Sequence, residues 1–165
     1  MSPTVSVIIP TFNRWPLVGA AIESVLAQTF SDFELIVVDD GSTDGTGVEL
    51  GKLGSRLQII SQPNRGVSAA RNLAARQARG IYLAFLDSDD FWLTDKLAIQ
   101  TAFMVRHPDV QICQTEEIWI RNGVRVNPKV KHRKPSGDIF IPSLDLCVVS
   151  PSAVMLTREL FEQVG

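Results

Sequence analysis

Residues 34–46 have the sequence ELIVVDDGSTDGT, and residues 81–90 have the sequence IYLAFLDSDD. Each segment holds an apolar run rich in Val, Ile, Leu and aromatic residues, which is typical of a strand buried on both faces of a parallel sheet. Acids follow both runs, at Asp39-Asp40 and within Asp87–Asp90. Ligands of open α/β sheets bind at the carboxyl edge of the strands. We therefore expect both acid groups to serve one site for a divalent metal and a nucleotide or polyhydroxy ligand.

Strands and helices alternate through the first half of the chain. The apolar periodicity predicts strands at 5–10, 33–39, 57–61 and 81–86, and helices at 15–28, 46–53, 67–78 and 94–107. Alternation of this kind predicts crossover connections in a three-layer α/β/α fold of the α/β class, with helices on both faces of a mostly parallel sheet.

The pattern changes after Asp90. Predicted strands at 110–120 and 124–127 flank Asn122-Gly123, a strong signal for a hairpin turn. A further buried strand is expected at 153–156, and Thr157 is expected to cap a closing helix over 158–164. The later part of the sheet is therefore predicted to be antiparallel.

Length and composition favour one domain over residues 1–165, since 165 residues with 45% apolar content can bury one core. The net charge of -2 disfavours a broad nucleic-acid-binding surface. A local basic stretch between Pro128 and Pro135 is favoured as a solvated loop, with a site for anionic lipid or an acidic acceptor as the alternative. Its members are Lys129, Lys131, His132, Arg133 and Lys134.

The two cysteines, Cys113 and Cys147, lie in apolar segments, which favours buried reduced thiols in a cytoplasmic protein. The sequence contains neither a signal-peptide pattern nor an apolar run of the roughly 20 residues that span a bilayer, so we expect a soluble chain. His107 and His132 have no Cys or His partner at ligand spacing, which disfavours a zinc site.

Four segments carry the motifs of a known family. They are SVIIPTFNR (residues 6–14), SVLAQTFSDFELIVVDDGSTDGT (24–46), GVSAARN (66–72) and GIYLAFLDSDDFW (80–92). In this order and spacing they resemble family 2 glycosyltransferases, and the similarity extends from Val5 to the last residue. The resemblance implies an inverting enzyme with the GT-A fold, the Rossmann-like fold of nucleotide-diphospho-sugar transferases.

The resemblance also implies substrates and a cofactor. A UDP-, GDP- or dTDP-sugar would donate its sugar to a hydroxyl of a saccharide or lipid-linked acceptor, in polysaccharide, cell-envelope or glycolipid synthesis, with peripheral association at the inner face of the membrane. Mn²⁺ or Mg²⁺ held by a carboxylate and bridging two phosphates would act as the Lewis acid. Residues 1–92 would form the nucleotide-sugar-binding half, and residues 93–165 the start of the acceptor-binding half.

The family motifs assign roles to residues of this chain. Asp89 is the expected metal ligand, and Asp87 is expected near the donor ribose or sugar. In an extended segment both would face the site while Ser88 turns aside; the role of Asp90 stays open. The alternative for this cluster is a solvated turn with helix-capping acids ahead of Lys96. The expected donor-binding residues are Pro10, Thr11, Phe12, Asp39, Asp40, Arg71, Asp87 and Ser88.

Several of these roles have a structural alternative. Asp40 is expected to accept an N–H of the base and Asp39 to brace the loop, but Asp-Gly-Ser is also ordinary turn sequence. Arg71 would reach base or phosphate, or else form a surface salt bridge. The backbone of Thr11 would approach the base and Phe12 would form an apolar wall.

Residues other than the motif acids also have both a possible site role and a structural alternative. Asn13 and Arg14 belong either to the site or to a turn and helix start. Trp92 packs either against a sugar or in the core. Glu116 and Glu117 are expected to have ordinary surface roles.

The resemblance places the general base in an acidic motif past Gly165, unless Asp138 or Asp145 replaces it. An inverting displacement needs that carboxylate on the face opposite the leaving group. We therefore expect residues 1–165 to be the donor-binding part of a longer, truncated enzyme, with poor transfer. Two other classes stay open: a non-catalytic nucleotide-sugar-binding module, and a sugar nucleotidyltransferase, which would need a Gly-rich loop where this chain has PTFNRW.

Overall fold

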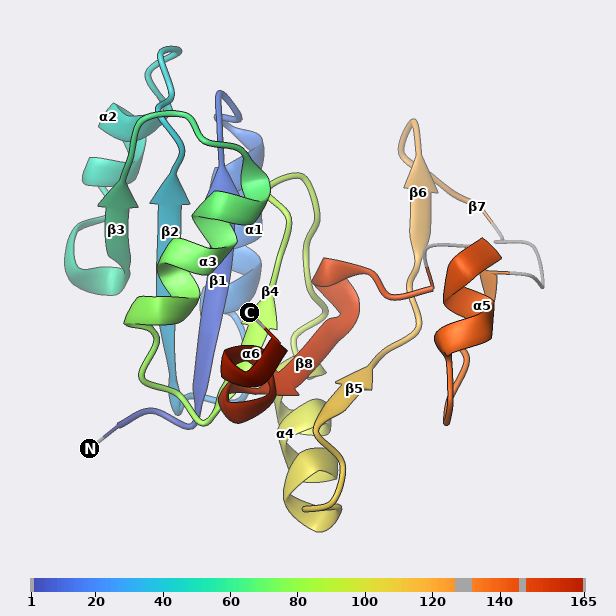
Figure 1. Ribbon diagram of the computed structural model, residues 1–165. Coiled ribbons are helices and arrows are strands. Elements are labelled where there is room, and N and C mark those ends of the chain that lie inside the picture. The colour runs from blue at the N-terminus through green and yellow to red at the C-terminus, as the bar shows by residue number, and fades with distance from the viewer. Residues whose placement is uncertain (1, 127–131, 146–147, 165) are drawn as a thin grey trace.

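The computed structural model describes residues 2–126, 132–145 and 148–164. Six strands form its main sheet: β1 (Val5–Thr11), β2 (Phe33–Asp39), β3 (Gln58–Ser61), β4 (Tyr82–Phe85), β5 (Ile112–Gln114) and β8 (Val154–Thr157). They lie in the order β3-β2-β1-β4-β8-β5 (Figure 1). The first four are parallel to one another, and β8 runs antiparallel to both β4 and β5. The predicted antiparallel portion is confirmed.

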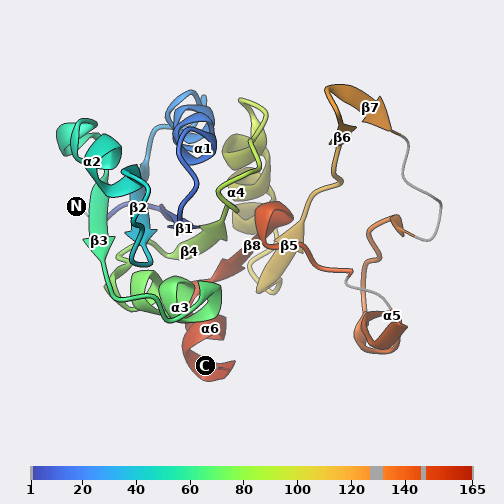
Figure 2. The ribbon, with the colours of Figure 1, turned by 90° about the horizontal axis from the view of Figure 1, so that it is seen from above.

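Helices cover both faces of this sheet (Figure 2). One face carries α1 (Leu17–Leu26), α2 (Thr46–Gly51) and α4 (Lys96–Arg106), and the other carries α3 (Val67–Gln77) and α6 (Arg158–Val164). Short 3-10 turns occur at η1 (Gly54–Arg56) and η3 (Pro151–Ala153). The predicted three-layer α/β fold is therefore confirmed.

The apolar runs of the strands explain the layering. Val7 and Ile9 of β1 pack with the α1 side, whereas Ile8 packs with the α3 side, and all three side chains are fully buried. Successive strand residues point to opposite faces, so only a continuous apolar run can bury both sides of a central strand.

The register brings the ends of three strands together. Thr11, the last residue of β1, pairs with Asp39 of β2, and Ile8 of β1 pairs with Phe85 of β4. The segments that follow β1, β2 and β4 therefore leave the sheet at the same edge, the upper edge in Figure 1. This is the carboxyl edge at which the sequence places its functional residues.

The predicted hairpin is confirmed: β6 (Trp119–Arg121) and β7 (Val124–Val126) pair antiparallel around Asn122 and Gly123. Both turn residues have positive φ, 51° and 74°, which a two-residue hairpin turn of type I′ requires. With α5 (Phe140–Asp145), this hairpin lies beyond the β5 edge of the main sheet in both ribbon views (Figures 1 and 2).

The prediction of one continuous strand over 110–120 is wrong. β5 ends at Gln114, and the chain leaves the sheet before β6 begins at Trp119. Glu116 and Glu117 lie in this break, where they face residue Lys134: its backbone N–H donates to Glu116, and its ammonium lies 3.0 Å from Glu117 Oε1. These tertiary partners outweigh the local strand preference of the segment.

Smaller predictions have mixed outcomes. Thr157 caps α6, since its hydroxyl accepts from the Leu160 N–H at 3.2 Å. Cys113 is a free, half-buried thiol. None of the described helices has the length and apolar character needed to cross a bilayer. The predictions for Lys129, Lys131, Cys147 and the side chain of Asp145 fall outside the described part of the chain.

Candidate functional site

The acids that follow β4 form a tight turn. The Asp90 N–H donates to the Asp87 carbonyl at 3.1 Å, and we call residues 87–90 the acidic turn. The prediction that Asp87 and Asp89 face one side of an extended segment is wrong, because the chain folds back here. Asp87 is half-buried, Ser88 is buried, and Asp89 is exposed at the tip.

Two arginines contact this turn. Arg71, on α3, places Nη2 2.5 Å from Asp87 Oδ1, and both side chains are largely buried. Arg14, from the loop after β1, lies 3.9 Å from Asp89, and both of those side chains are about half exposed. The first pair is fixed and the second is loose, so Asp89 is the acid of this turn with the weakest hold from its surroundings.

The acids that follow β2 are committed to the protein. Asp40 is buried, and its Oδ1 accepts from Gln62 Nε2 (2.5 Å) and the Arg65 N–H (2.9 Å), while Oδ2 accepts from the Gly66 N–H (2.8 Å). Burial raises the pKa of Asp40, but these three donors outweigh it and leave the pKa below its ordinary value. Asp40 therefore braces the loop that leads into α3, and one acceptor position of Oδ2 stays unfilled by these donors.

Asp39 is also buried and braces its own loop, as expected, by accepting from the Ser42 N–H at 3.0 Å. Asn13 holds the same loop from the other side. Its backbone N–H donates to Ser42 Oγ, and its Oδ1 accepts from the Thr43 N–H. Asn13 has a φ of 52°, so the turn alternative is the one that the structure supports for this residue.

The end of β1 lies between these two acid groups. Pro10 and Thr11 are buried, and the Thr11 carbonyl accepts from the Asp40 N–H at 2.9 Å. Thr11 Oγ1 is buried and has no hydrogen-bond partner among the described residues. The next side chain, Phe12, is 43% exposed and offers a free aromatic surface at the same edge.

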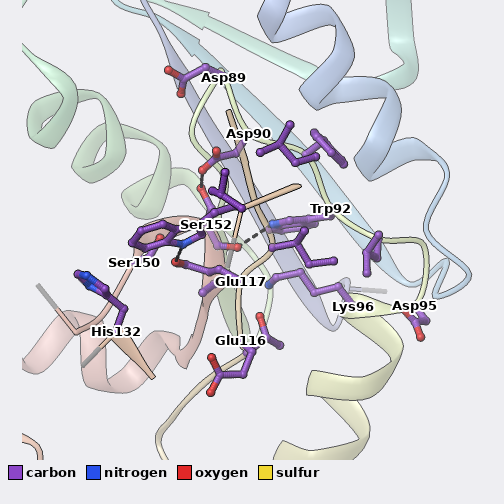
Figure 3. A pocket seen from close by; sticks show the side chains of 18 of the residues that line it. Asp89, Asp90, Trp92, Asp95, Lys96, Glu116, Glu117, His132, Ser150 and Ser152 are labelled. Carbon is purple, nitrogen blue, oxygen red and sulfur yellow. Dashed lines mark hydrogen bonds between the residues drawn. The ribbon is translucent and has the colours of Figure 1, made fainter. Parts of the chain in front are cut away.

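A hollow lies beside the acidic turn, which contributes Asp89 and Asp90 to its lining. It is a cavity of about 1240 Å³, and its lining includes Asp89, Asp90, Lys96, Glu117, Trp119 and Ser152 (Figure 3). Asp39 and Asp40 do not line it. The two acid groups thus share an edge of the sheet, as expected, but not this cavity.

Trp92 takes the core alternative. It is buried, its indole N–H donates to the Ser152 carbonyl at 2.8 Å, and Lys96 Nζ lies 4.1 Å from its ring centroid. Lys96 is itself buried and donates to Gln100 Oε1. The sequence motifs assign no role to Lys96, Gln100 or Ser152; for the first two, the available signal was their i, i+4 spacing within the predicted helix, which places them on one helix face.

The donor set fits a metal that is completed by its ligand. Among the described residues there is no cluster of three or more His, Cys, Asp or Glu that could enclose an ion. The side chain of Asp89 is 53% exposed, and among the described residues Arg14, at 3.9 Å, is its only ion-pair partner. Mg²⁺ and similar hard cations bind well through one or two carboxylates plus phosphate oxygens and water, and Asp89 can supply such an anchor.

Comparisons with known proteins show the family of this chain. The model of the family described as "Glycosyl transferase family 2" matches residues 6–165. The chain is 38% identical over 161 residues to an uncharacterized glycosyltransferase of Rickettsia felis, covering 96% of this chain and 27% of that protein. It therefore spans about a quarter of the length of this curated relative.

Two further similarities are to a protein whose name states an activity and to a crystal structure with a bound nucleotide-sugar. The chain is 39% identical over 105 residues to the Escherichia coli UDP-Glc:alpha-D-GlcNAc-diphosphoundecaprenol beta-1,3-glucosyltransferase WfgD, covering 62% of this chain and 42% of that protein. It is also similar to the crystal structure of S. aureus TarS 1-349 in complex with UDP-GlcNAc, with a TM-score of 0.78, 27% identity, and coverage of 99% of this chain and 47% of that one. The expected GT-A architecture is confirmed by this match.

Proposed function

Since this chain belongs to glycosyl transferase family 2, we propose that it binds a nucleotide-diphospho-sugar at the carboxyl edge of β1, β2 and β4. As part of a transferase, it would pass the sugar with inversion to the hydroxyl of a saccharide or lipid-linked acceptor. The observation that carries this proposal is the half-exposed Asp89, placed at the same edge as Thr11 and Asp40 with two arginines beside the turn.

The nucleotide lies, in this proposal, between the ends of β1 and β2. The unfilled position of Asp40 Oδ2 accepts an N–H of the base, because a carboxylate can only accept. The exposed ring of Phe12 packs on the base, and Pro10 and Thr11 shape the floor. Asp39 acts by holding the loop that closes this side.

The diphosphate and ribose lie near the acidic turn. Arg71 uses one of its five N–H donors for Asp87, and the others are directed to phosphate or base. Asp87 and the buried Ser88 face the ribose or the donor sugar. Asp89 holds Mn²⁺ or Mg²⁺; when bound, this cation neutralises charge on the leaving nucleotide diphosphate.

The acceptor belongs to the large cavity beyond Asp90, which carries two tryptophans and several carboxylates. WfgD and the TarS complex carry UDP-sugars in their names, so a UDP-sugar is the first donor to test. The name of WfgD also includes a lipid-linked saccharide, which is the reason to include such acceptors and a peripheral position at the cytoplasmic face of the membrane in the proposal.

Binding titrations test the proposal. UDP-Glc, UDP-GlcNAc, GDP-mannose and dTDP-glucose are titrated into the protein with and without Mn²⁺, and we expect at least one of them to bind about tenfold more tightly with the metal, a difference of about 1.4 kcal/mol. Asp89→Ala should abolish this gain. The matched control is Asp109→Ala, which removes an exposed acid from the turn between α4 and β5 and should keep it.

Each result has a distinct meaning. Metal-dependent binding that survives in Asp89→Ala would move the metal to another residue. Binding of none of the four donors by a folded protein would overturn the proposed function. Release of pyrophosphate from a sugar phosphate and a nucleoside triphosphate would instead identify a nucleotidyltransferase. Metal-dependent binding without transfer would fit both a binding module and the donor-binding part of a transferase.

A further inference from the structure

Ser152 joins the two ends of the acidic turn. It belongs to η3, more than 60 residues further along the chain, yet its Oγ accepts from the Asp87 N–H at 3.1 Å. The same Oγ donates to Asp90 Oδ2 at 2.5 Å (Figure 3). One hydroxyl thus serves as acceptor at the start of the turn and as donor at its end. Asp89, at the tip, is carried by the backbone between these two contacts.

The position of Ser152 is itself fixed by buried groups. The Trp92 indole N–H donates to the Ser152 carbonyl at 2.8 Å, and Gln100 Nε2 donates to the next carbonyl, that of Ala153, at 3.0 Å. Trp92, Gln100 and Ala153 are all nearly fully buried. The hydroxyl therefore stands on a rigid base and can impose a geometry on the turn, since buried hydrogen-bonded networks have few alternative arrangements.

The turn needs such a restraint because its own charges oppose it. Asp87, Asp89 and Asp90 place three carboxylates within four residues, and like charges at this spacing repel. Arg71 neutralises Asp87, and the Ser152 hydroxyl turns Asp90 toward η3. Within the described part of the chain, this hydroxyl is the one hydrogen-bond partner of the Asp90 side chain.

We propose that Ser152 is a positioning residue, which holds the acidic turn in the conformation in which Asp89 can bind the divalent cation. This rests on the proposed function, because it assumes metal-assisted binding of a nucleotide diphosphate. Ser152 is not a metal ligand in this proposal; it acts through the turn. Loss of the Ser152 hydroxyl should weaken binding of the metal and leave intact the contacts to the base of the nucleotide.

The test measures metal binding directly rather than turnover. Mn²⁺ is titrated into the protein with saturating UDP, and free Mn²⁺ is followed by electron paramagnetic resonance. Ser152→Ala should raise the Mn²⁺ dissociation constant about tenfold, while the affinity for UDP without metal stays within a factor of two. Ser152→Thr, which keeps the hydroxyl, should recover most of the loss, and Ser55→Ala, at an exposed position of η1, should behave as the wild type.

The outcomes separate this inference from the proposed function. If the wild type binds Mn²⁺ with UDP and Ser152→Ala binds it equally well, Ser152 has no positioning role. If Ser152→Ala loses metal-free UDP affinity and thermal stability in the same proportion as metal affinity, and Ser152→Thr fails to recover them, the role is only structural and the inference is overturned. A wild type that shows no Mn²⁺ binding with UDP or with any of the four nucleotide-sugar donors would overturn the proposed function together with this role.

Discussion

Lys96 should make the stability of the protein rise with pH above neutrality. Its side chain is only 7% exposed, and its ammonium lies between the Trp92 ring and Gln100 Oε1. Burial lowers the pKa of Lys96 from 10.5 to about 7, although the neighbouring Cys113 opposes this shift. The folded protein therefore gives up this proton near neutral pH, whereas the unfolded chain keeps it to a much higher pH.

The sign and size follow from proton linkage. Above pH 7 the unfolded state binds more protons than the folded state, so the free energy of unfolding increases with pH, by at most about 1.4 kcal/mol per pH unit. Between pH 7 and 8.5 the gain from Lys96 is roughly 1 to 2 kcal/mol, because the folded lysine is half-protonated at the start of this range. Below about pH 6 both states are protonated, and the slope from this group vanishes.

Urea denaturation from pH 6 to 8.5 measures this slope. Lys96→Met should remove most of it, since methionine has a similar length and no charge. Lys52→Met is the matched control, because Lys52 is an exposed lysine paired with Glu49 on the surface, and it should keep the wild-type slope. The range stops at pH 8.5 because burial raises the pKa of Cys113 above that of the unfolded chain, so at higher pH ionisation of this thiol in the unfolded state would oppose the slope from Lys96. Equal slopes in the wild type and Lys96→Met would refute the reasoning.

Two further predictions concern the edges of the parallel sheet. Gly80→Ala would place a Cβ 2.5 Å from a backbone nitrogen of β1, so it should lower the free energy of unfolding, measured by urea denaturation, by about 3 kcal/mol or more. The control Gly51→Ala meets open space and should be neutral or slightly stabilising. Equal effects of the two substitutions would contradict the packing at Gly80. Asp40→Asn replaces one acceptor oxygen by a donor that faces backbone N–H groups, so it should lower the free energy of unfolding by about 1 to 3 kcal/mol and weaken nucleotide binding. Unchanged stability in Asp40→Asn would show that the loop before α3 does not depend on this carboxylate.

The layers of the fold could be predicted because they depend on local patterns. The run LIVV (residues 35–38) in β2 has no polar residue to face water, so it had to be a central strand, and the stripe of Val18, Ile22 and Val25 had to face the sheet. The hairpin at Asn122-Gly123 followed from the positive φ that these residues tolerate. In each case the deciding property lies within a few neighbouring residues.

The details of the site could not be predicted, because distant partners decide them. Asp87–Asp90 has the composition of an extended segment or a turn, and Ser152 from the other end of the chain fixes the turn. Likewise, the break in 110–120 depends on Lys134, and the role of Asp40 depends on donors from residues 62–66. No local pattern in the sequence records which donor reaches which carboxylate.

The number of internal donors distinguishes the carboxylates that support the site from the one that can serve a ligand. Asp40 accepts from three donors, Asp87 is paired with a largely buried guanidinium, and Asp90 is held by a hydroxyl. A cation at any of these would first have to displace a hydrogen-bond partner, and a hydrogen bond to a charged group is worth about 1.5 to 3 kcal/mol, less where it is exposed, as at Asp90. At Asp89 it would displace only a solvated contact of 3.9 Å to Arg14, a kind of pair whose contribution is about 0 to 1 kcal/mol. The donors to Asp87 and Asp90 make these two acids poor metal ligands, and they also hold the backbone of the turn that carries Asp89. Removing one of these donors should therefore weaken metal binding without removing a metal ligand.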